Sequence, residues 1–214
     1  MRVTIEQPQL LKSLQMIEHA VNDRSALPIL ANVLLETKEQ EFVLTATDLD
    51  MGVRYRLPSF TIEKPGAVTL PARRLTTIVR ELPEELVIIE VKQNYHAVVS
   101  CGASRFRLPG LPPEDFPLLP PHDEADALSL PQTTLKTLLQ YTTFAMSLEE
   151  TRFILNGALL KTHDGTLTLA ATDGRRLAVA TGKETPQSLS GKELSVVVPS
   201  KTIRELMRLL QDDG

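Results

Sequence analysis

The segment Ile29–Asp48, ILANVLLETKEQEFVLTATD, returns later in the chain as Ile154–Asp173, ILNGALLKTHDGTLTLAATD. The two stretches align without a gap at an offset of 125 residues, and nine of their twenty positions are identical. The identical residues of the first stretch are Ile29, Leu30, Leu34, Leu35, Thr37, Leu44, Ala46, Thr47 and Asp48. A repeat of this length indicates a duplicated domain rather than the short unit of a solenoid.

The same offset continues upstream, where both copies carry apolar residues at helical spacing. Leu10, Leu14 and Ile17 fall on one face, and Leu10 and Leu14 match Leu135 and Leu139 of the second copy. This spacing is typical of an amphipathic helix. We therefore predict helices over 7–24 and 132–147.

Each copy also carries a second amphipathic helix, predicted over 71–82 and 199–210. Each of these opens with a proline, a residue that suits the first helical turn. Runs of β-forming residues predict antiparallel strands over 29–37, 41–47, 51–60, 87–92, 97–101 and 104–108. The predicted fold class is α+β, a repeated domain in which two helices pack on antiparallel sheets.

The two copies are separated by Pro109–Asp126, a segment rich in Pro and acidic residues that suits neither a helix nor a sheet interior. We therefore expect a first domain over 1–117, a linker over 118–127 and a second domain over 128–214. Phe116 is expected to pin the connecting segment back onto the first domain.

The second copy is predicted to be incomplete at its carboxyl end. With three extra residues before its second helix, Gly214 corresponds to position 86 of the first copy, so the three closing strands have no counterpart. A sheet that lacks those strands would leave unpaired edge groups, which natural domains avoid. We expect the chain to be the amino-terminal fragment of a longer protein.

Charge is distributed unevenly along the chain. The four predicted helices hold nine Lys or Arg and four Asp or Glu, a net of +5, which leaves −9 for the rest of a chain whose total is −4. One interpretation is a positive helical surface and a separate negative one. The other is that exposed helix faces simply favour Lys and Arg. The composition leaves both interpretations open.

Several classes of protein are disfavoured by composition. Cys101 is the single cysteine and the four histidines are scattered, so we expect neither a disulfide framework nor a metal site, and no cofactor. No apolar run approaches the roughly 18 residues of a membrane span, and the amino terminus lacks a secretory leader. We expect a cytoplasmic protein.

The most chemically suggestive motif is Thr172-Asp173-Gly174-Arg175-Arg176. Its counterpart in the first copy also begins with Thr-Asp but continues with different residues, so we interpret the shared Asp as a turn cap rather than a catalytic acid. No nucleophile and base stand at motif spacing. An enzyme is therefore disfavoured, and it would require turnover that depends on Asp173 or Arg175.

Basic residues lie away from the apolar stripe of each second helix. They are Arg73, Arg74 and Arg80 in the first copy and Lys201, Arg204 and Arg208 in the second. Such helices side by side would follow a phosphate backbone without reading its sequence. Aromatic residues do not interleave with the basic ones, so duplex DNA is favoured over single strands.

Five motifs in combination resemble one family. They are LPILAN at 27–32, ATDL at 46–49, PAR at 71–73, LPPEDFP at 111–117 and ATDGRRL at 171–177. Together they resemble the bacterial sliding clamps, the β subunits of DNA polymerase III, and the resemblance spans all 214 residues.

The resemblance implies a non-catalytic processivity factor. Three copies of one domain in each of two protomers would form a head-to-tail ring, with helices inside, around duplex DNA of any sequence. Implied partners are the DNA polymerase III catalytic subunit, the clamp loader and other polymerases, which bind through short peptides. Because the third domain is absent, we expect this chain to be monomeric. The alternative is a clamp-derived peptide-binding module that does not encircle DNA.

The resemblance and the basic helix faces together assign eight residues to DNA contact. Arg24 matches a loop arginine of the family, and Glu149 stands where the family usually carries an uncharged amide, with Arg152 able to compensate. The full set is Arg24, Arg73, Arg74, Arg80, Glu149, Arg152, Lys201 and Arg204.

A peptide-binding pocket is also implied by the resemblance, and part of it is expected beyond Gly214. Its residues in this chain are Leu155, Thr172, Gly174, Arg175, Arg176 and Leu177. Arg175 replaces the imidazole that is common in the family. Without the resemblance, Leu155 and Leu177 would be interpreted as core residues of strands.

Overall fold

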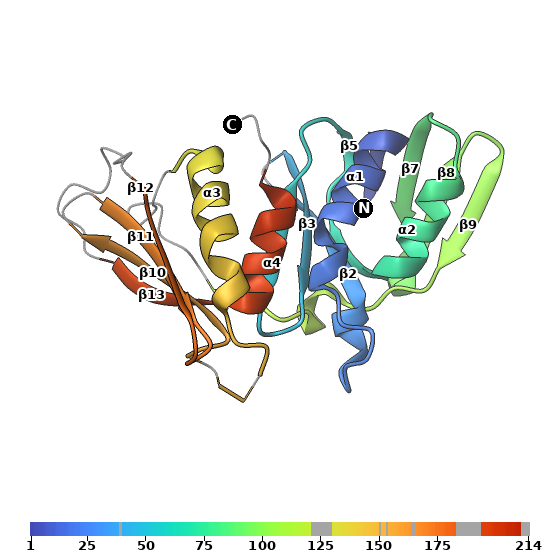
Figure 1. Ribbon diagram of the computed structural model, residues 1–214. Helices are drawn as coiled ribbons and strands as arrows, with labels where there is room; N and C mark the ends of the chain where they lie inside the picture. The colour runs from blue at the N-terminus through green and yellow to red at the C-terminus, as the bar shows by residue number, and fades with distance from the viewer. Residues whose placement is uncertain are drawn as a thin grey trace. The chain divides into compact units, whose positions relative to one another are not determined.

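The computed structural model describes residues 1–38, 40–120, 130–149, 151–152, 154–163, 166–182 and 194–210. The chain forms two compact units, the first spanning Met1–Pro120 and the second Pro121–Gly214. Figure 1 shows that each unit combines a pair of helices with antiparallel sheet. No helix in the described ranges is long and apolar enough to cross a membrane. Those ranges also contain no cluster of three His, Cys, Asp or Glu side chains that would hold a metal ion.

The first unit contains a four-stranded sheet of order β4-β3-β2-β6. Its strands are β2 (Asn32–Lys38), β3 (Glu41–Thr47), β4 (Gly52–Arg56) and β6 (Ala67–Pro71). Leu35 lies opposite Leu44 on β3 and opposite Val68 on β6. Alternate residues therefore point to the core, and this register buries Val33, Leu35 and Leu44 together.

A second, five-stranded sheet of order β5-β1-β7-β8-β9 completes the first unit. Its strands are β1 (Arg2–Glu6), β5 (Thr61–Lys64), β7 (Leu86–Val91), β8 (Ala97–Cys101) and β9 (Ser104–Leu108). The three closing strands predicted for the first copy are confirmed as β7, β8 and β9. Val3, Ile5, Val87 and Ile89 of this sheet are fully buried in the same core as the first sheet.

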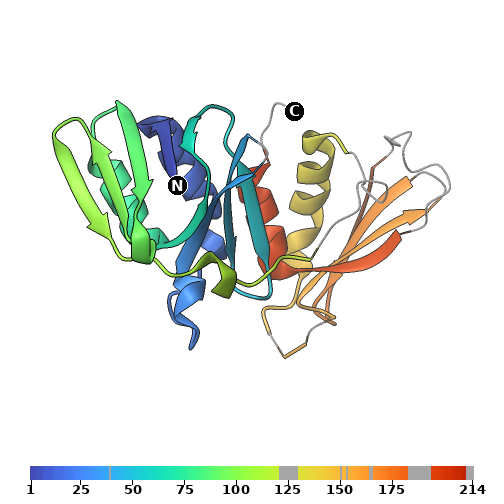
Figure 2. The same cartoon turned by 180° about the vertical axis from the view of Figure 1, so that it is seen from behind.

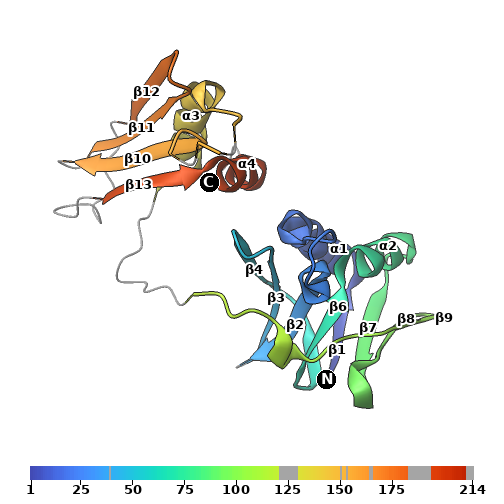
Figure 3. The same cartoon turned by 90° about the horizontal axis from the view of Figure 1, so that it is seen from below.

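Helices α1 (Gln7–Ile17) and α2 (Ala72–Glu81) lie side by side in the first unit (Figure 3). Their apolar faces close the core, because Leu10 and Leu14 of α1 and Leu75 of α2 have at most 1% of their surface exposed. Burial of these faces rather than helix propensity holds the two helices in place.

The predicted boundaries of six elements need correction. Helix 7–24 is too long, because α1 ends at Ile17 and a 3₁₀ turn over Glu18–Ala20 leads into an extended Val21. The Asn22 N–H then donates to the Leu30 carbonyl, which turns the chain toward β2. Helix 132–147 ends in the same way at Thr142.

Proline accounts for the remaining corrections. Pro71 and Pro199 are not first helical residues, since each ends a strand with extended ψ and precedes the helix. Pro28 starts a 3₁₀ turn that delays β2 until Asn32. The strand predicted over 51–60 stops at Arg56 and resumes as β5, because Pro58 lacks the N–H that a ladder needs.

The second unit repeats the helix pair and the four-stranded sheet of the first unit. Its elements are α3 (Gln132–Thr142), α4 (Ser200–Leu209), β10 (Gly157–His163), β11 (Thr166–Thr172), β12 (Leu177–Gly182) and β13 (Leu194–Pro199). The sheet order is β12-β11-β10-β13. Leu160 lies opposite Leu169 and Val196, which reproduces the pairing of Leu35 with Leu44 and Val68. The duplication predicted from the sequence is therefore confirmed at the level of strand register.

Candidate nucleic-acid interface and peptide pocket

The basic face of α2 is solvent-exposed. Arg73, Arg74 and Arg80 are all exposed, whereas Leu75 and Val79 on the opposite side are fully buried. The structure thus brings the three predicted arginines onto one face of one helix. This face has the charge and the exposure that phosphate contact requires.

The Arg24 loop lies beside the amino terminus of α2. Asp23 Oδ2 lies 3.1 Å from Arg73 Nη1, and the Arg24 backbone N–H donates to Asn22 Oδ1 at 3.1 Å. Because both partners of the Asp23–Arg73 pair are well exposed, the pair adds little stability, but it holds the loop near the helix. Arg24 itself is exposed next to this pair.

The basic face of α4 is less exposed than that of α2. Arg208 pairs with Glu205 at 3.0 Å, and Arg204 donates from Nε to the Ser200 carbonyl at 3.3 Å and from Nη2 to Ser200 Oγ at 3.4 Å. Lys201 is half-buried in the first turn, and the Arg208 side chain is 32% exposed, against 64% for Arg73 in its pair with Asp23. Each helix thus has one arginine paired with a carboxylate, but the α4 face presents less of its positive charge to solvent.

Glu149 and Arg152, both predicted to face DNA, form an ion pair of 2.8 Å with each other. They line a depression of about 470 Å³ that Gly174, Arg175 and Arg176 close from the other side. The structure therefore brings part of the predicted DNA loop and part of the predicted pocket into one site. The Glu149 carboxylate offsets the Arg152 charge, so this loop is a weaker anion site than two predicted contacts would suggest.

The turn that carries Gly174 is built by side-chain capping. Thr172 Oγ1 donates to the Arg176 carbonyl and accepts from the Gly174 N–H, while Asp173 Oδ1 accepts from the N–H groups of Arg175 and Arg176. These backbone hydrogen bonds, with that to Arg175 the largest cause, lower the pKa of Asp173 below its ordinary value.

The first unit contains the same turn. Thr47 Oγ1 donates to the Met51 carbonyl, and Asp48 Oδ1 accepts from the N–H groups of Asp50 and Met51. Leu49 has a left-handed φ of 78°, where the second copy has Gly174 at 89°. The interpretation of the repeated Thr-Asp as a turn cap is therefore confirmed in both units.

A second depression of about 240 Å³ lies next to the first and contains residues that the sequence did not suggest. Its lining combines Phe144, Met146 and Leu148 with Arg176 and Arg204. The Arg176 guanidinium carbon lies 5.8 Å from the centre of the Phe144 ring, within range of a cation–π contact. The sequence signal for this depression was two apolar residues, Phe144 and Met146, just after the end of α3. The periodicity of the sequence does not show that they lie near Arg176.

Three predicted pocket residues lie outside these two depressions. These residues are Thr172, Leu155 and Leu177. The Thr172 hydroxyl is engaged in the hydrogen bonds of the turn, Leu155 is half-buried, and Leu177 is 68% exposed at the start of β12. The core interpretation of Leu177 is therefore wrong. Leu177 instead presents apolar surface to solvent, as does Ile154, which is 78% exposed.

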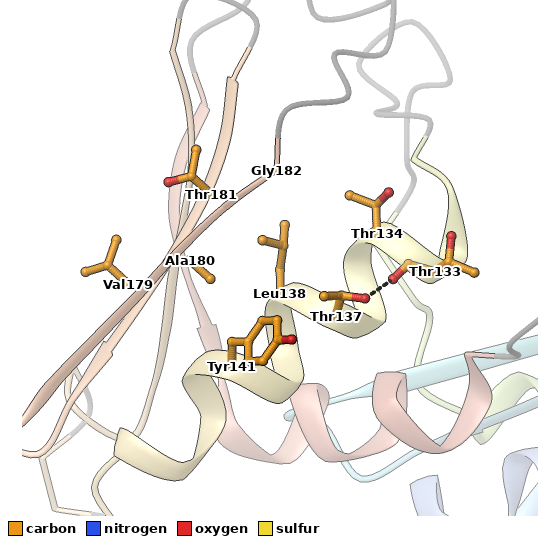
Figure 4. A pocket seen from close by; sticks show the side chains of 9 residues that line it. All are labelled: Thr133, Thr134, Thr137, Leu138, Tyr141, Val179, Ala180, Thr181 and Gly182. Atoms are coloured by element: carbon orange, nitrogen blue, oxygen red, sulfur yellow. Dashed lines mark hydrogen bonds between the residues drawn. The ribbon is translucent and has the colours of Figure 1, made fainter.

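A groove of about 680 Å³ runs between α3 and β12 (Figure 4). Thr133, Thr137, Leu138 and Tyr141 of the helix and Val179 and Ala180 of the strand are among the residues that line it. In Figure 4 the Ala180 side chain points toward the helix, whereas Val179 points to the other side of the strand. Thr137 Oγ1 donates to the Thr133 carbonyl at 2.8 Å, so that hydroxyl is already engaged. None of the lining residues is charged.

Two domain models of one protein family match this chain. The model of the DNA polymerase III beta subunit, N-terminal domain, matches residues 1–120, and that of the central domain matches residues 129–214. The chain belongs to the DNA polymerase III beta subunit family. The resemblance noted in the sequence is confirmed, and the two adjacent family domains account for the internal repeat.

Individual members of the family are similar over the whole chain. The beta sliding clamp of Proteus mirabilis is 42% identical over 214 residues, which are 100% of this chain and 58% of the relative. That of Escherichia coli strain K12 is 40% identical over 210 residues, covering 98% of this chain and 57% of the relative. The chain therefore spans little more than half the length of the curated relatives that it matches.

Solved structures of the family share the fold. The DNA polymerase sliding clamp of Bacillus subtilis superposes with a TM-score of 0.93 at 34% identity, over 100% of this chain and 57% of that one. The DnaN sliding clamp of Pseudomonas aeruginosa, bound to griselimycin, gives 0.89 at 40% identity, over 100% and 58%. The predicted α+β class, a repeated clamp domain with an incomplete second copy, agrees with these structures.

Proposed function

We propose that this chain provides the first domain and most of the second domain of a ring-forming sliding clamp that acts as a processivity factor for the replicative DNA polymerase. The observation that carries the proposal is the exposed arginine face of α2, within a chain that belongs to the DNA polymerase III beta subunit family. In such a ring the link to duplex DNA is topological, so weak, sequence-independent phosphate contact is sufficient and permits sliding.

In this proposal Arg24, Arg73, Arg74 and Arg80 contact DNA from the first unit, and Arg152, Lys201 and Arg204 contact it from the second. Glu149 would weaken its own loop's contact through the pair with Arg152. The proposed clamp is non-catalytic and is a head-to-tail homodimer, whereas this chain alone is monomeric. A stable ring-shaped dimer of the 214-residue chain in solution scattering would contradict that last statement.

Polymerases and the clamp loader are proposed to bind the second unit through short peptides, at Leu155, Thr172, Gly174, Arg175, Arg176 and Leu177. The exposed apolar side chain of Leu177, next in sequence to the cationic Arg175 and Arg176, suits a peptide with an apolar anchor and an acidic neighbour. Arg175 would favour acidic peptides more than a neutral imidazole does.

Primer extension in the presence of trap DNA tests the processivity proposal. The protein encoded by the complete gene should lengthen the products of a single binding event, and this effect should fall when Arg73, Arg74 and Arg80 are replaced by Ala. Product lengths that are unchanged by the wild-type protein would contradict the proposal.

A second candidate function is a peptide-binding module that does not encircle DNA. It is favoured by the two depressions of the second unit, which this chain forms from its own residues. Titration of a labelled polymerase tail peptide separates the two candidates, because the module requires tight binding by this chain alone, whereas half of a shared pocket should bind weakly.

A further inference from the structure

Two leucines of the first unit lie largely in solvent. Leu27 and Leu49 are 50% and 60% exposed among the residues that the structure describes. Just after Leu27 in the sequence, Ile29 and Leu30 are buried against Phe116, which belongs to the yellow-green segment that follows β9 in Figure 2. The expectation that Phe116 pins this segment onto the first domain is confirmed. The segment covers this apolar stretch only in part and leaves Leu27 exposed.

Leu49 has a backbone conformation that is costly for a residue with a Cβ. Its φ of 78° lies in the left-handed region, and the turn around it is fixed by the N–H groups of Asp50 and Met51, which donate to Asp48 Oδ1. The second unit has Gly174 at this position of the same turn, where no Cβ penalty arises. The first unit therefore holds a leucine in a strained conformation although the side chain packs little, which points to a use outside the chain.

The repeat places the two leucines next to each other. Leu27 and Leu49 correspond to Arg152 and Gly174 at the offset of 125 residues, and a Cβ at Gly174 would lie 4.0 Å from Arg152 Nη1. The backbone agrees as well, since the carbonyls of Leu27 and Arg152 each accept from the N–H three residues later. We therefore assign Leu27 and Leu49 to one exposed apolar surface, which we call the leucine patch.

The turn beside the leucine patch has the opposite charge to its counterpart. The turn over 47–51 contains two aspartates and no cation, whereas the turn over 172–176 contains one aspartate and two arginines. The exposed Asp50 stands where the second unit has Arg175. On the other side of the patch, Arg24 is assigned to DNA above and Asp23 pairs with Arg73. An apolar surface beside exposed carboxylate suits a basic protein segment better than a phosphate backbone.

We propose that the leucine patch is a docking surface for a protein segment that carries an apolar anchor next to lysine or arginine. Leu27 and Leu49 make the apolar contact, and Asp50 attracts the basic neighbour. A glycine at position 49 would remove the strain and also the contact, so the leucine has a use that offsets its cost. This inference goes beyond the proposed function, whose peptide site lies in the second unit and favours acidic peptides.

The test uses the 214-residue chain and two short fluorescein-labelled peptides. Both peptides have two adjacent central leucines, which are flanked by lysines in one peptide and by glutamates in the other. The lysine peptide should bind saturably with a Kd on the order of 100 µM at low salt, and added salt should weaken its binding. The glutamate peptide should not compete with it for the leucine patch.

Three variants separate docking from a structural role. Leu49→Gly should weaken binding of the lysine peptide about tenfold. It should leave the first unit at least as stable in urea, because Gly adopts this φ without a Cβ penalty. Asp50→Asn should weaken binding severalfold, because it removes the charge beside the anchor. Leu118→Ser, at a leucine of the first unit that is 96% exposed, is the matched control and should leave binding unchanged.

Methyl NMR spectra locate the lysine peptide on the protein. Shifts at Leu27 and Leu49 support the proposal, whereas shifts confined to the second unit overturn it. It is also overturned if binding is absent at millimolar peptide, if the glutamate peptide competes equally well, or if binding survives Leu49→Gly. Weaker duplex DNA binding by Leu49→Gly with unchanged peptide binding would assign the patch to DNA instead. The assays of processivity and of polymerase-peptide binding are separate, so failure here leaves the proposed function standing.

Discussion

The two units share a fold but differ in how completely their apolar faces are covered. Leu10 of the first unit has no exposed surface, whereas its counterpart Leu135 is only half-buried. Val79 and Met207 differ in the same way. In the first unit the five-stranded sheet shares one core with the two helices, and Phe116 covers Ile29 and Leu30. The repeated residues therefore determine the path of the chain, and the surrounding layer determines how much each residue contributes to stability.

The largest difference in stability between the two units is expected from the matched substitutions Leu10→Ala and Leu135→Ala. Leu10→Ala should cost the first unit about 3 kcal/mol, because it empties a fully covered site, and Leu135→Ala should cost the second unit about 1 kcal/mol. Hydrogen exchange during urea titration reads the stability of each unit separately. Equal losses in the two units would show that the second unit is covered as fully as the first.

Exchanging the residues at one pair of equivalent positions, Val33 and Ala158, tests how well each core is filled. The core of the second unit encloses an apolar void of about 60 Å³ lined in part by Ala158, and Val33 stands at the equivalent place in the first unit. Val33→Ala should destabilise the first unit by about 2 kcal/mol. Ala158→Val should stabilise the second by about 0.5 kcal/mol, because it fills the void. Both changes are measured by urea unfolding, and destabilisation by Ala158→Val would refute the void.

Basic residues on the two second helices should differ in their effect on DNA. Triple replacement by Ala of Arg73, Arg74 and Arg80 should weaken duplex binding about tenfold at low salt and lower the salt slope by about 2 to 3. The corresponding change of Lys201, Arg204 and Arg208 should do less, because Lys201 is half-buried and the Arg208–Glu205 pair is less exposed than the Arg73–Asp23 pair. Fluorescence anisotropy across a salt series gives both slopes. A larger effect from α4 would contradict the charge assignment.

The smallest effect is expected at the turn capped by Asp173, whose side chain is 25% exposed. Because its pKa is lowered in the folded chain, the turn's stabilisation is present above the ordinary carboxyl pKa and is lost as pH falls through the lowered value. Carboxyl NMR titration should therefore give a midpoint below the ordinary value. Asp173→Asn, which keeps an acceptor oxygen, should preserve the turn at neutral pH, whereas Asp173→Ala should disorder it.

Much of this architecture could be predicted because the sequence repeats. The offset of 125 residues located both α1 and α3, and the extra three residues before α4 reappear in the register of β13 against β10. Helix ends and strand breaks were harder to predict from the sequence, because they depend on single residues such as Pro28 and Pro58 that interrupt an otherwise regular pattern.

Contacts between elements distant in sequence could be predicted least. The contact of Arg176 with the Phe144 ring depends on how one loop folds back on a distant turn, which periodicity does not encode. The expected role of Phe116 was correct because a lone aromatic residue in a Pro-rich segment has few other ways to be buried. The contact of Leu119 with Gly52 could not be predicted in this way, because the chain has many leucines.

The central functional claim is that DNA is held by topology, and one measurement tests it directly. The protein from the complete gene is loaded by its clamp loader onto nicked circular DNA, washed at high salt, and the bound fraction is compared before and after the circle is linearised. The account predicts retention on the circle and loss after linearisation, because screening leaves only the topological link. Retention that is unchanged by linearisation, or absent from the circle, would contradict it.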